Sequence, residues 1–365
     1  MPYINTMKLV KTITAKVYQP TARKRKALEV LWRSWKDALG LKRDYAFLRE
    51  NTDLPSYYCR ELFWKIKEGA NAPIGVPKDA LKLMPGGTFA PWFASIPTPD
   101  GRVRVPLRMS RGHGKLLGEC EICDSQLLKR GKEYHLHIVI SKDAPIPTIP
   151  SHAPVLAVDI GERVIATSVM LVEGTVSSPG FHGREIRSIR RHYAWLRKRL
   201  GRRKLLRVIK RVGRTEHRKV DARLHVIAAS LVEQAREMGA VIAIGDLSGI
   251  RKGSRGRRLN RIVNAMPFNR LSTFIEYKAA WAGVPVIKVD EAYSSRECRI
   301  CHQNGKRPSQ GRFVCPSCGE YNADLNGAVN IGSRALAYMA IAGAPGIAPL
   351  RGTPSPQVLC DAMLC

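Results

Sequence analysis

Two Cys-x-x-Cys pairs constrain the fold of this chain more than any other feature. They are Cys298-x-x-Cys301 and Cys315-x-x-Cys318, separated by 13 residues. Each pair fits a knuckle that directs two thiolates at one metal ion, and two knuckles complete a tetrahedron. The spacing therefore predicts a ribbon with a structural zinc ion in a closed site, which stabilises folding and takes no part in catalysis.

The pair Cys120-x-x-Cys123 is a weaker signal. In a regular strand residues i and i+3 face opposite sides, so we interpret this pair as strand packing. The sequence shows no secretory signal, and glycines and a proline interrupt its longest uncharged stretch, 335–350. We therefore expect a reducing compartment, the cytoplasm with nucleoid association, where cysteines hold metal rather than form disulfides.

The charge of the chain points to a polyanion. Its 365 residues include 61 Lys and Arg against 30 Asp and Glu, a formal net charge of +31, while 44% hydrophobic residues indicate a folded protein. Nucleic acid is the first expected partner and an anionic membrane surface the second.

The positive charge is concentrated in two segments. Residues 184–219 keep a helical spacing of apolar side chains with cations on the other face, and residues 251–261 interleave cations with Gly and Ser. A solvated helix face is the plainer reading, but such faces carry mixed signs. The residues expected to contact phosphates are Arg190, Arg191, Arg197, Lys198, Arg202, Arg203, Lys204, Arg251, Lys252, Arg257 and Arg258.

The first part of the chain reads as an α+β domain over residues 1–142. Alternation predicts a strand at 8–20, helical periodicity predicts helices at 22–41 and 53–66, and turn residues predict hairpins at Asp100-Gly101 and Arg130-Gly131-Lys132. Four prolines indicate a linker at 143–154.

An α/β pattern follows the linker, because short apolar runs alternate with helical periodicity. Strands are expected at 155–159, 164–172, 240–244 and 284–289, with a helix at 268–281 and a loose tail at 343–365.

Two carboxylates occupy suggestive places in this α/β region. Asp159 ends an apolar strand, and Asp324 lies in the first turn of a helix whose apolar residues would pack on the sheet. Such a pair is the skeleton of a two-metal phosphodiesterase. Asp324 could also be a helix N-terminal acid that the helix dipole favours.

Four segments resemble the TnpB (OrfB) proteins of insertion sequences, which are related to type V CRISPR effectors. The resemblance is dense over 155–336 and loose over 8–142. The segments are Val158-Asp-Ile-Gly161, Gly245-Asp-Leu-Ser-Gly-Ile-Arg251, Tyr293-Ser-Ser-x-x-Cys298 and Ala323-Asp-Leu-Asn-x-Ala-x-Asn-Ile331.

The resemblance implies a fold and an activity. The fold would be an RNase H-like RuvC nuclease domain over 155–291, a zinc ribbon inserted at 292–322, a last RuvC helix at 323–342, and a barrel-like wedge with a helical recognition insert over 1–142. The activity would be Mg²⁺-dependent, RNA-guided cleavage of DNA. Guide RNA and target DNA would be the partners, a transposase could be encoded nearby, and no membrane would be involved.

One departure concerns the catalytic acids. The resemblance implies a Glu at the end of the fourth strand, where this chain has Gly245. We expect Glu291, at the end of the fifth strand, to replace it, since neighbouring strands are about 4.8 Å apart and some TnpB and Fanzor proteins carry a relocated glutamate. Asp159 would then bridge two Mg²⁺ ions, with Asp324 and Glu291 each holding one.

Other readings of these acids stay open. Glu291 could be a solvated strand-end acid, Asp246 could substitute if a bulge turned it inward, and Asp290 and Glu276 are further candidates. The function we predict is RNA-guided DNA cleavage. The alternatives are a nuclease-inactive, repressor-like RNA-guided DNA-binding protein, a miniature type V CRISPR effector, and a zinc-ribbon nucleic-acid binder unrelated to RuvC.

Overall fold

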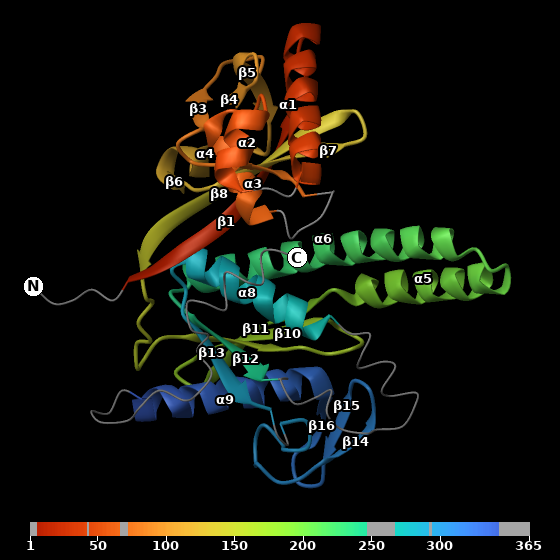
Figure 1. Cartoon of the computed structure of the whole chain (residues 1–365). Helices are drawn as coiled ribbons and strands as arrows, with labels where there is room; N and C mark the ends of the chain where they lie inside the picture. Colours follow the sequence, from red (N-terminus) through yellow and green to blue (C-terminus); the bar gives the residue numbers. More distant parts are fainter. Residues whose placement is uncertain (1–5, 42–43, 66–71, 247–266, 292–293, 343–365) are drawn as a thin grey trace, which may run out of the picture. The chain divides into compact units, whose positions relative to one another are not determined.

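The computed structural model describes residues 6–41, 44–65, 72–246, 267–291 and 294–342 (Figure 1). Within them the chain forms two compact units, one over Thr6–Ala144 and the other from Pro145 onward. Four cations predicted to contact phosphates, Arg251, Lys252, Arg257 and Arg258, and the tail 343–365 lie outside the described residues.

The first unit is built on one sheet with the strand order β2-β7-β8-β1-β5-β4-β3, and β6 pairs with β8. Its strands are β1 (Thr6–Val17), β2 (Ile74–Val76), β3 (Lys82–Pro85), β4 (Trp92–Thr98), β5 (Gly101–Arg108), β6 (Glu121–Ile122), β7 (Ser125–Arg130) and β8 (Glu133–Pro145). Both predicted hairpins are confirmed as β4–β5 and β7–β8.

Four helices accompany this sheet: α1 (Ala22–Leu41), α2 (Tyr45–Asn51), α3 (Ser56–Lys65) and α4 (Arg111–Glu119). The bounds of α1 match the prediction, and its apolar face buries Leu28, Leu31 and Trp35. The Trp35 indole donates a hydrogen bond to the Ala72 carbonyl over 3.2 Å, so the buried polar group is satisfied.

Three local predictions differ from the structure. Helix α4 was not predicted, because three glycines lower helix propensity there; Ser110 caps it by accepting a bond from the His113 amide. Strand β8 extends to Pro145, into the expected linker. Cys120 and Cys123 flank the two-residue strand β6 and do not share one strand; the Cys123 thiol donates to the Ser141 hydroxyl.

The second unit contains a five-stranded sheet with the order β11-β10-β9-β12-β13. Its strands are β9 (Val155–Asp159), β10 (Ala166–Val172), β11 (Thr175–His182), β12 (Val241–Asp246) and β13 (Val286–Asp290). Strands β9, β12 and β13 are parallel, and β10 and β11 are antiparallel additions. The expected neighbours are confirmed: β9 lies beside β12, and β12 beside β13.

Both faces of this sheet are buried, which explains the continuous apolar runs of its parallel strands. Val155 and Ala157 face the last helix, α9 (Ala323–Ala342). Leu156 and Val158 face α6 (Leu206–Glu237) and α8 (Phe268–Ala282). The result is three layers, with helices on either side of the sheet (Figure 1).

Two further parts complete the unit. Helix α5 (Arg184–Arg202) pairs with α6 to form a long hairpin (Figure 1). A three-stranded ribbon, β14 (Lys306–Ser309), β15 (Arg312–Cys315) and β16 (Gly319–Asn322), precedes α9. Among the described helices, none combines the length and the hydropathy that a membrane crossing requires.

Candidate active site and metal centre

The four predicted cysteines come together in the ribbon. The sulfur atoms of Cys298, Cys301, Cys315 and Cys318 all lie within 4.8 Å of one another, and the Cys301 and Cys315 sulfurs are 3.4 Å apart. A tetrahedral zinc ion with Zn–S bonds of ~2.3 Å needs sulfur atoms about 3.8 Å apart. The thiol donors and their spacing therefore fit a closed structural metal site.

The ribbon has a small core of its own behind these thiols. Phe313 is fully buried there with Cys298 and Ala323. Gly305 has no room for a side chain, because a Cβ would lie 2.7 Å from the Val314 carbonyl oxygen and would also overlap the Phe313 ring. A core this small is typical of ribbons that a structural metal ion stabilises.

Asp159 ends β9 beneath helix α9. A Cβ on Gly327 of α9 would lie 2.9 Å from an Asp159 carboxylate oxygen, so a larger residue at position 327 would displace this carboxylate. Burial raises the pKa of Asp159 to about 7; the Asp324 charge adds to this effect and Arg307 opposes it. The structure thus brings Asp159 next to Asp324.

Asp324 lies one turn before Gly327 on α9 and is 8% exposed. Asn322 caps this helix, because its side-chain oxygen accepts from the amides of Asp324 and Leu325, both at 3.0 Å. Arg307 of β14 donates to the Asp324 carboxylate over 2.7 Å. The helix N-terminus and a ribbon arginine therefore both stabilise this buried acid.

Glu291 fills the space that a side chain at position 245 would take. Gly245 pairs with Val289 across β12 and β13, and a Cβ built on Gly245 would overlap the carboxyl group of Glu291. Ile244 pairs with Val158, so Gly245 comes level with Asp159. Glu291 therefore reaches across the end of β12 toward Asp159.

The Glu291 carboxyl group lies in a buried, anionic environment. Its Oε1 atom is buried and has no hydrogen-bond partner within the described part of the chain. Burial raises the pKa of Glu291 to about 8, and the charge of Asp159 adds to the effect. Carboxylate oxygens are the ligands that Mg²⁺ prefers, so Asp159, Glu291 and Asp324 fit a divalent metal site.

The carboxylates are less tightly gathered than the thiols. Over the described residues, the cysteines alone form a group of three or more potential ligands whose atoms all lie within 4.8 Å. Negative charges repel one another in a buried site, whereas thiols can be protonated and pack closely.

The alternative acids are placed differently. Asp246 is exposed and pairs in register with Asp290, beyond the end of the apolar strand. Glu276 forms an ion pair with Lys288 at 2.9 Å. The atoms nearest to a Cβ built on Gly245 all belong to Glu291.

The cationic hairpin shows which predicted residues are exposed. Among the predicted phosphate contacts, those exposed are Arg191, Lys198, Arg202, Arg203 and Lys204. Arg197 pairs with the buried Glu216, and Arg190 is half-buried near Glu162, which holds part of the charge within the protein. The predicted apolar stripe packs unevenly, because Leu205 at the tip of the hairpin is 42% exposed.

An exposed aromatic residue interrupts these cations. The Trp195 side chain on α5 is 54% exposed, and the Arg199 guanidinium lies 5.4 Å from its ring centroid. Sequence reasoning had not singled out this residue. Its position on the polar face of an otherwise cationic helix was the available signal.

Comparisons with known proteins found similar sequences and a similar fold. Residues 268–331 match the family model "Cas12f1-like, TNB domain". A CRISPR-associated endodeoxyribonuclease Cas12f2 of Micrarchaeota archaeon is 27% identical over 303 residues, 75% of this chain and 50% of that protein. A TnpB-like protein of Methanocaldococcus jannaschii is 27% identical over 173 residues, 45% of this chain and 62% of that protein.

This chain is related to the TnpB and Cas12f proteins. The matches cover 50% and 62% of these two relatives' own lengths. The fold agrees as well: a Cas12f1–sgRNA–target DNA complex aligns with a TM-score of 0.58 at 13% identity, over 85% of this chain and 82% of that one. The expected kinship with TnpB is thereby confirmed.

Sequence reasoning missed the side chains that surround the acids. Arg307 gave no signal, because its contact with Asp324 depends on how the ribbon folds against α9. The spacing of four residues between Asn326, Asn330 and Arg334 places them on one face of a helix, which was the available signal for these three side chains.

Proposed function

We propose that this chain is an RNA-guided DNA endonuclease with an RNase H-like RuvC nuclease centre formed by Asp159, Glu291 and Asp324. The observation that carries the proposal is the placement of Glu291 over Gly245, which supplies a carboxylate where the resemblance to TnpB implies one. The names of its relatives support DNA cleavage, and the aligned Cas12f1 complex holds guide RNA and target DNA.

The chain's own residues would divide the work as follows. Asp159, from the central strand, faces both other acids and is suited to a shared position between two Mg²⁺ ions. Asp324 and Glu291 approach from α9 and from the end of β13. When bound, the ions would activate the attacking water and stabilise the leaving oxygen of the phosphodiester.

Arg307 adds a cation to this anionic site. Its contact with Asp324 restrains the carboxylate before metal is present. A guanidinium so close to the acids is also within reach of a phosphate bound there, which favours a polyanionic substrate.

Zinc in the four-cysteine cluster would have a structural role. A closed tetrahedral site leaves no open position for substrate. The ribbon that it stabilises carries Arg307 and leads directly into Asp324 on α9.

The test is to purify the protein with its bound RNA, sequence that RNA, and incubate the complex with a matching plasmid and Mg²⁺. We expect cleavage that depends on the match and is lost in Asp159→Ala. A wild type that binds the target without cutting would favour the repressor-like alternative. Protein that never carries RNA would contradict guided recognition altogether.

The guide RNA is proposed to bind the α5–α6 hairpin. Aromatic stacking contributes about 1–3 kcal/mol per base, so Trp195→Ala should weaken RNA binding roughly 5- to 160-fold without changing its salt dependence. Lys198→Ala should instead reduce the salt slope. Val226→Ala, at a site 62% exposed on α6, is the matched control. Equal effects at Trp195 and Val226 would exclude a stacking role.

A further inference from the structure

One face of α9 carries three polar side chains at intervals of four residues: Asn326, Asn330 and Arg334. This spacing places them in a row along about 12 Å of the helix. Asn326 and Asn330 are 0% and 3% exposed. Buried amides need hydrogen-bond partners, so the partners of this row show which segments of the chain it holds in place.

The partners lie at the end of β13 and in the residues that lead into the first zinc knuckle. Arg334 donates to the Asp290 carbonyl over 2.7 Å, and Asn330 donates to the Ser294 carbonyl over 2.8 Å. These two carbonyls flank Glu291 on either side. Asp290 and Ser294, which lie on either side of Glu291 in the sequence, are thereby both hydrogen-bonded to the helix that carries Asp324.

The same row also holds the first zinc knuckle. Asn326 and Asn330 both donate to the Glu297 carbonyl, at 2.7 and 2.8 Å. The Asn326 side-chain oxygen accepts from the Arg299 amide at 3.0 Å. Residues 297 and 299 flank Cys298, so one helix face contacts both the glutamate segment and the cysteine knuckle.

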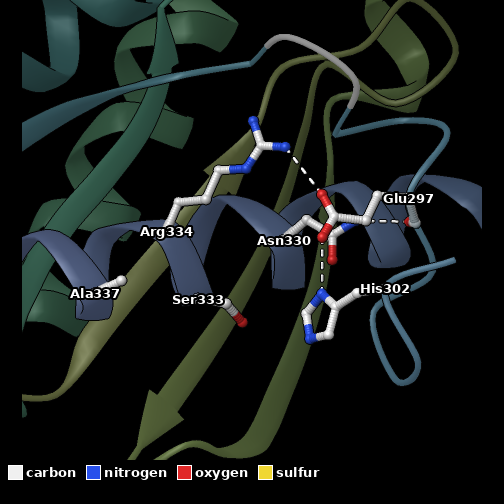
Figure 2. Close-up of a pocket in the computed structure, with 6 residues that line it drawn as sticks. All are labelled: Glu297, His302, Asn330, Ser333, Arg334 and Ala337. Carbon is white, nitrogen blue, oxygen red and sulfur yellow. Dashed lines mark hydrogen bonds and ion pairs between the residues drawn. The ribbon is translucent and has the colours of Figure 1, made fainter.

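A pocket marks the outer edge of this arrangement. It is lined by Glu297, His302, Asn330, Ser333, Arg334 and Ala337 (Figure 2). In it the Glu297 carboxylate bridges Arg334 at 3.0 Å and His302 at 2.7 Å. His302 follows Cys301 directly, so the ion-pair chain runs from α9 to the second cysteine of the knuckle.

We propose that Asn326, Asn330 and Arg334 form a positioning row that holds Glu291 at the catalytic metal site and couples that site to the zinc ribbon. This inference rests on the proposed function, since it assigns Glu291 as a metal ligand. Contacts that orient metal ligands typically change metal affinity 10- to 100-fold when removed. The row should therefore act on metal affinity more than on the cleavage step itself.

The first experiment uses Arg334→Gln in the full chain, freed of RNA at high salt, and measures Mn²⁺ binding by electron paramagnetic resonance. Asp159→Ala defines non-specific binding. We expect the dissociation constant to rise about 10-fold, with bound zinc unchanged. Ser333→Ala, in the same pocket, is the control and should bind Mn²⁺ like the wild type. Unchanged Mn²⁺ affinity in Arg334→Gln would overturn the proposal.

Cleavage kinetics separate positioning from general stability. In the RNA-loaded complex, Arg334→Gln should raise the half-saturating Mg²⁺ concentration while the rate at saturating Mg²⁺ falls less. Arg334→Lys, which keeps one donor, should lie between the variant and the wild type. If Arg334→Gln fails to fold and Arg334→Lys shows wild-type Mg²⁺ dependence, Arg334 is only structural and the proposal is wrong.

The coupling to zinc has its own test. Cys318→Ser should weaken Mn²⁺ binding in the wild-type background but have a much smaller further effect in Arg334→Gln, because coupled residues are non-additive. Additive effects would contradict the coupling. If the wild type cleaves DNA and Arg334→Gln has the same Mn²⁺ affinity and the same Mg²⁺ dependence, only this inference is contradicted. If the wild type neither binds Mn²⁺ nor cleaves DNA, the proposed function is contradicted.

Discussion

The four-thiol cluster and the proposed carboxylate site of this protein are assembled in opposite ways. The thiols come from 21 consecutive residues, Cys298 to Cys318, and two local turns place them. The carboxylates come from positions 159, 291 and 324, and they are brought together by the order of strands in the sheet and by the packing of α9 on it. Local spacing thus defines the first cluster, while topology defines the second.

This difference affects how each cluster tolerates change. A cysteine of the knuckles has one geometrically possible position, because chain spacing fixes it. A carboxylate at the sheet edge needs only to reach the space beside the end of β12. The Glu291 carboxyl group reaches that space from the end of the neighbouring strand, β13.

The largest expected effect is on cleavage when an acid is removed. Glu291→Ala should lower plasmid cleavage more than about 100-fold, since removing a direct metal ligand exceeds the loss of an outer contact. Asp246→Ala and Glu276→Ala should stay much closer to the wild-type rate. If Glu291→Ala cleaved at the wild-type rate while Asp159→Ala was inactive, Glu291 would have no role in cleavage.

The second effect tests the locally encoded cluster. Cys298→Ser should abolish the single bound zinc and expose the ribbon core around Phe313, because metal binding supplies the folding free energy of such ribbons. Elemental analysis and proteolysis of residues 294–322 measure this. The carboxylate variants should keep their zinc; if they lost it, the two clusters would not be separate sites.

The third prediction moves the carboxylate from position 291 to position 245. Gly245→Glu alone should impair cleavage, because the new side chain overlaps Glu291. The double variant Gly245→Glu, Glu291→Ala should recover to within about 10-fold of wild type, as expected if position in space and not in sequence matters. A folded double variant as inactive as Glu291→Ala would mean that β12 cannot present a working acid.

The smallest effect concerns stability without magnesium. The raised pKa of Asp159, about 7, means that the folded protein keeps a proton that the unfolded chain releases near pH 4. Stability should therefore fall as pH rises from about 4 to 7. Asp159→Asn should flatten this slope and raise the melting midpoint by a few degrees at pH 8. An unchanged slope would show that Asp159 is not the group that keeps this proton in the folded protein.

Periodicity and spacing predicted much of the second unit. The strands ending at Asp159 and Asp290, helix α8 and the zinc knuckles were all identifiable, because buried strands and paired cysteines have strong local patterns. Helix α4 was missed, because its three glycines mimic a loop and tertiary contacts overrode their low propensity.

The contacts around the acids could not be predicted in the same way. The pairing of Arg307 with Asp324, and the bonds of Arg334 to the Glu291 segment, join residues whose separation in sequence carries no periodic signal. Strand order could be inferred, but the rotation of a ribbon against a helix depends on packing of the whole unit.

The bare backbone at Gly245 has a consequence for sorting such sequences by computer. A profile that requires an acid at the end of the fourth strand would score this chain as a dead copy, although an oxygen-bearing side chain occupies that spot from forty-six positions downstream. Surveys of gene decay among mobile elements would then overcount inactive members. A structure-based search could instead ask which side chain fills the space beside the end of the fourth strand. Such a search would separate sequences that have lost the carboxylate from those that supply it from another position.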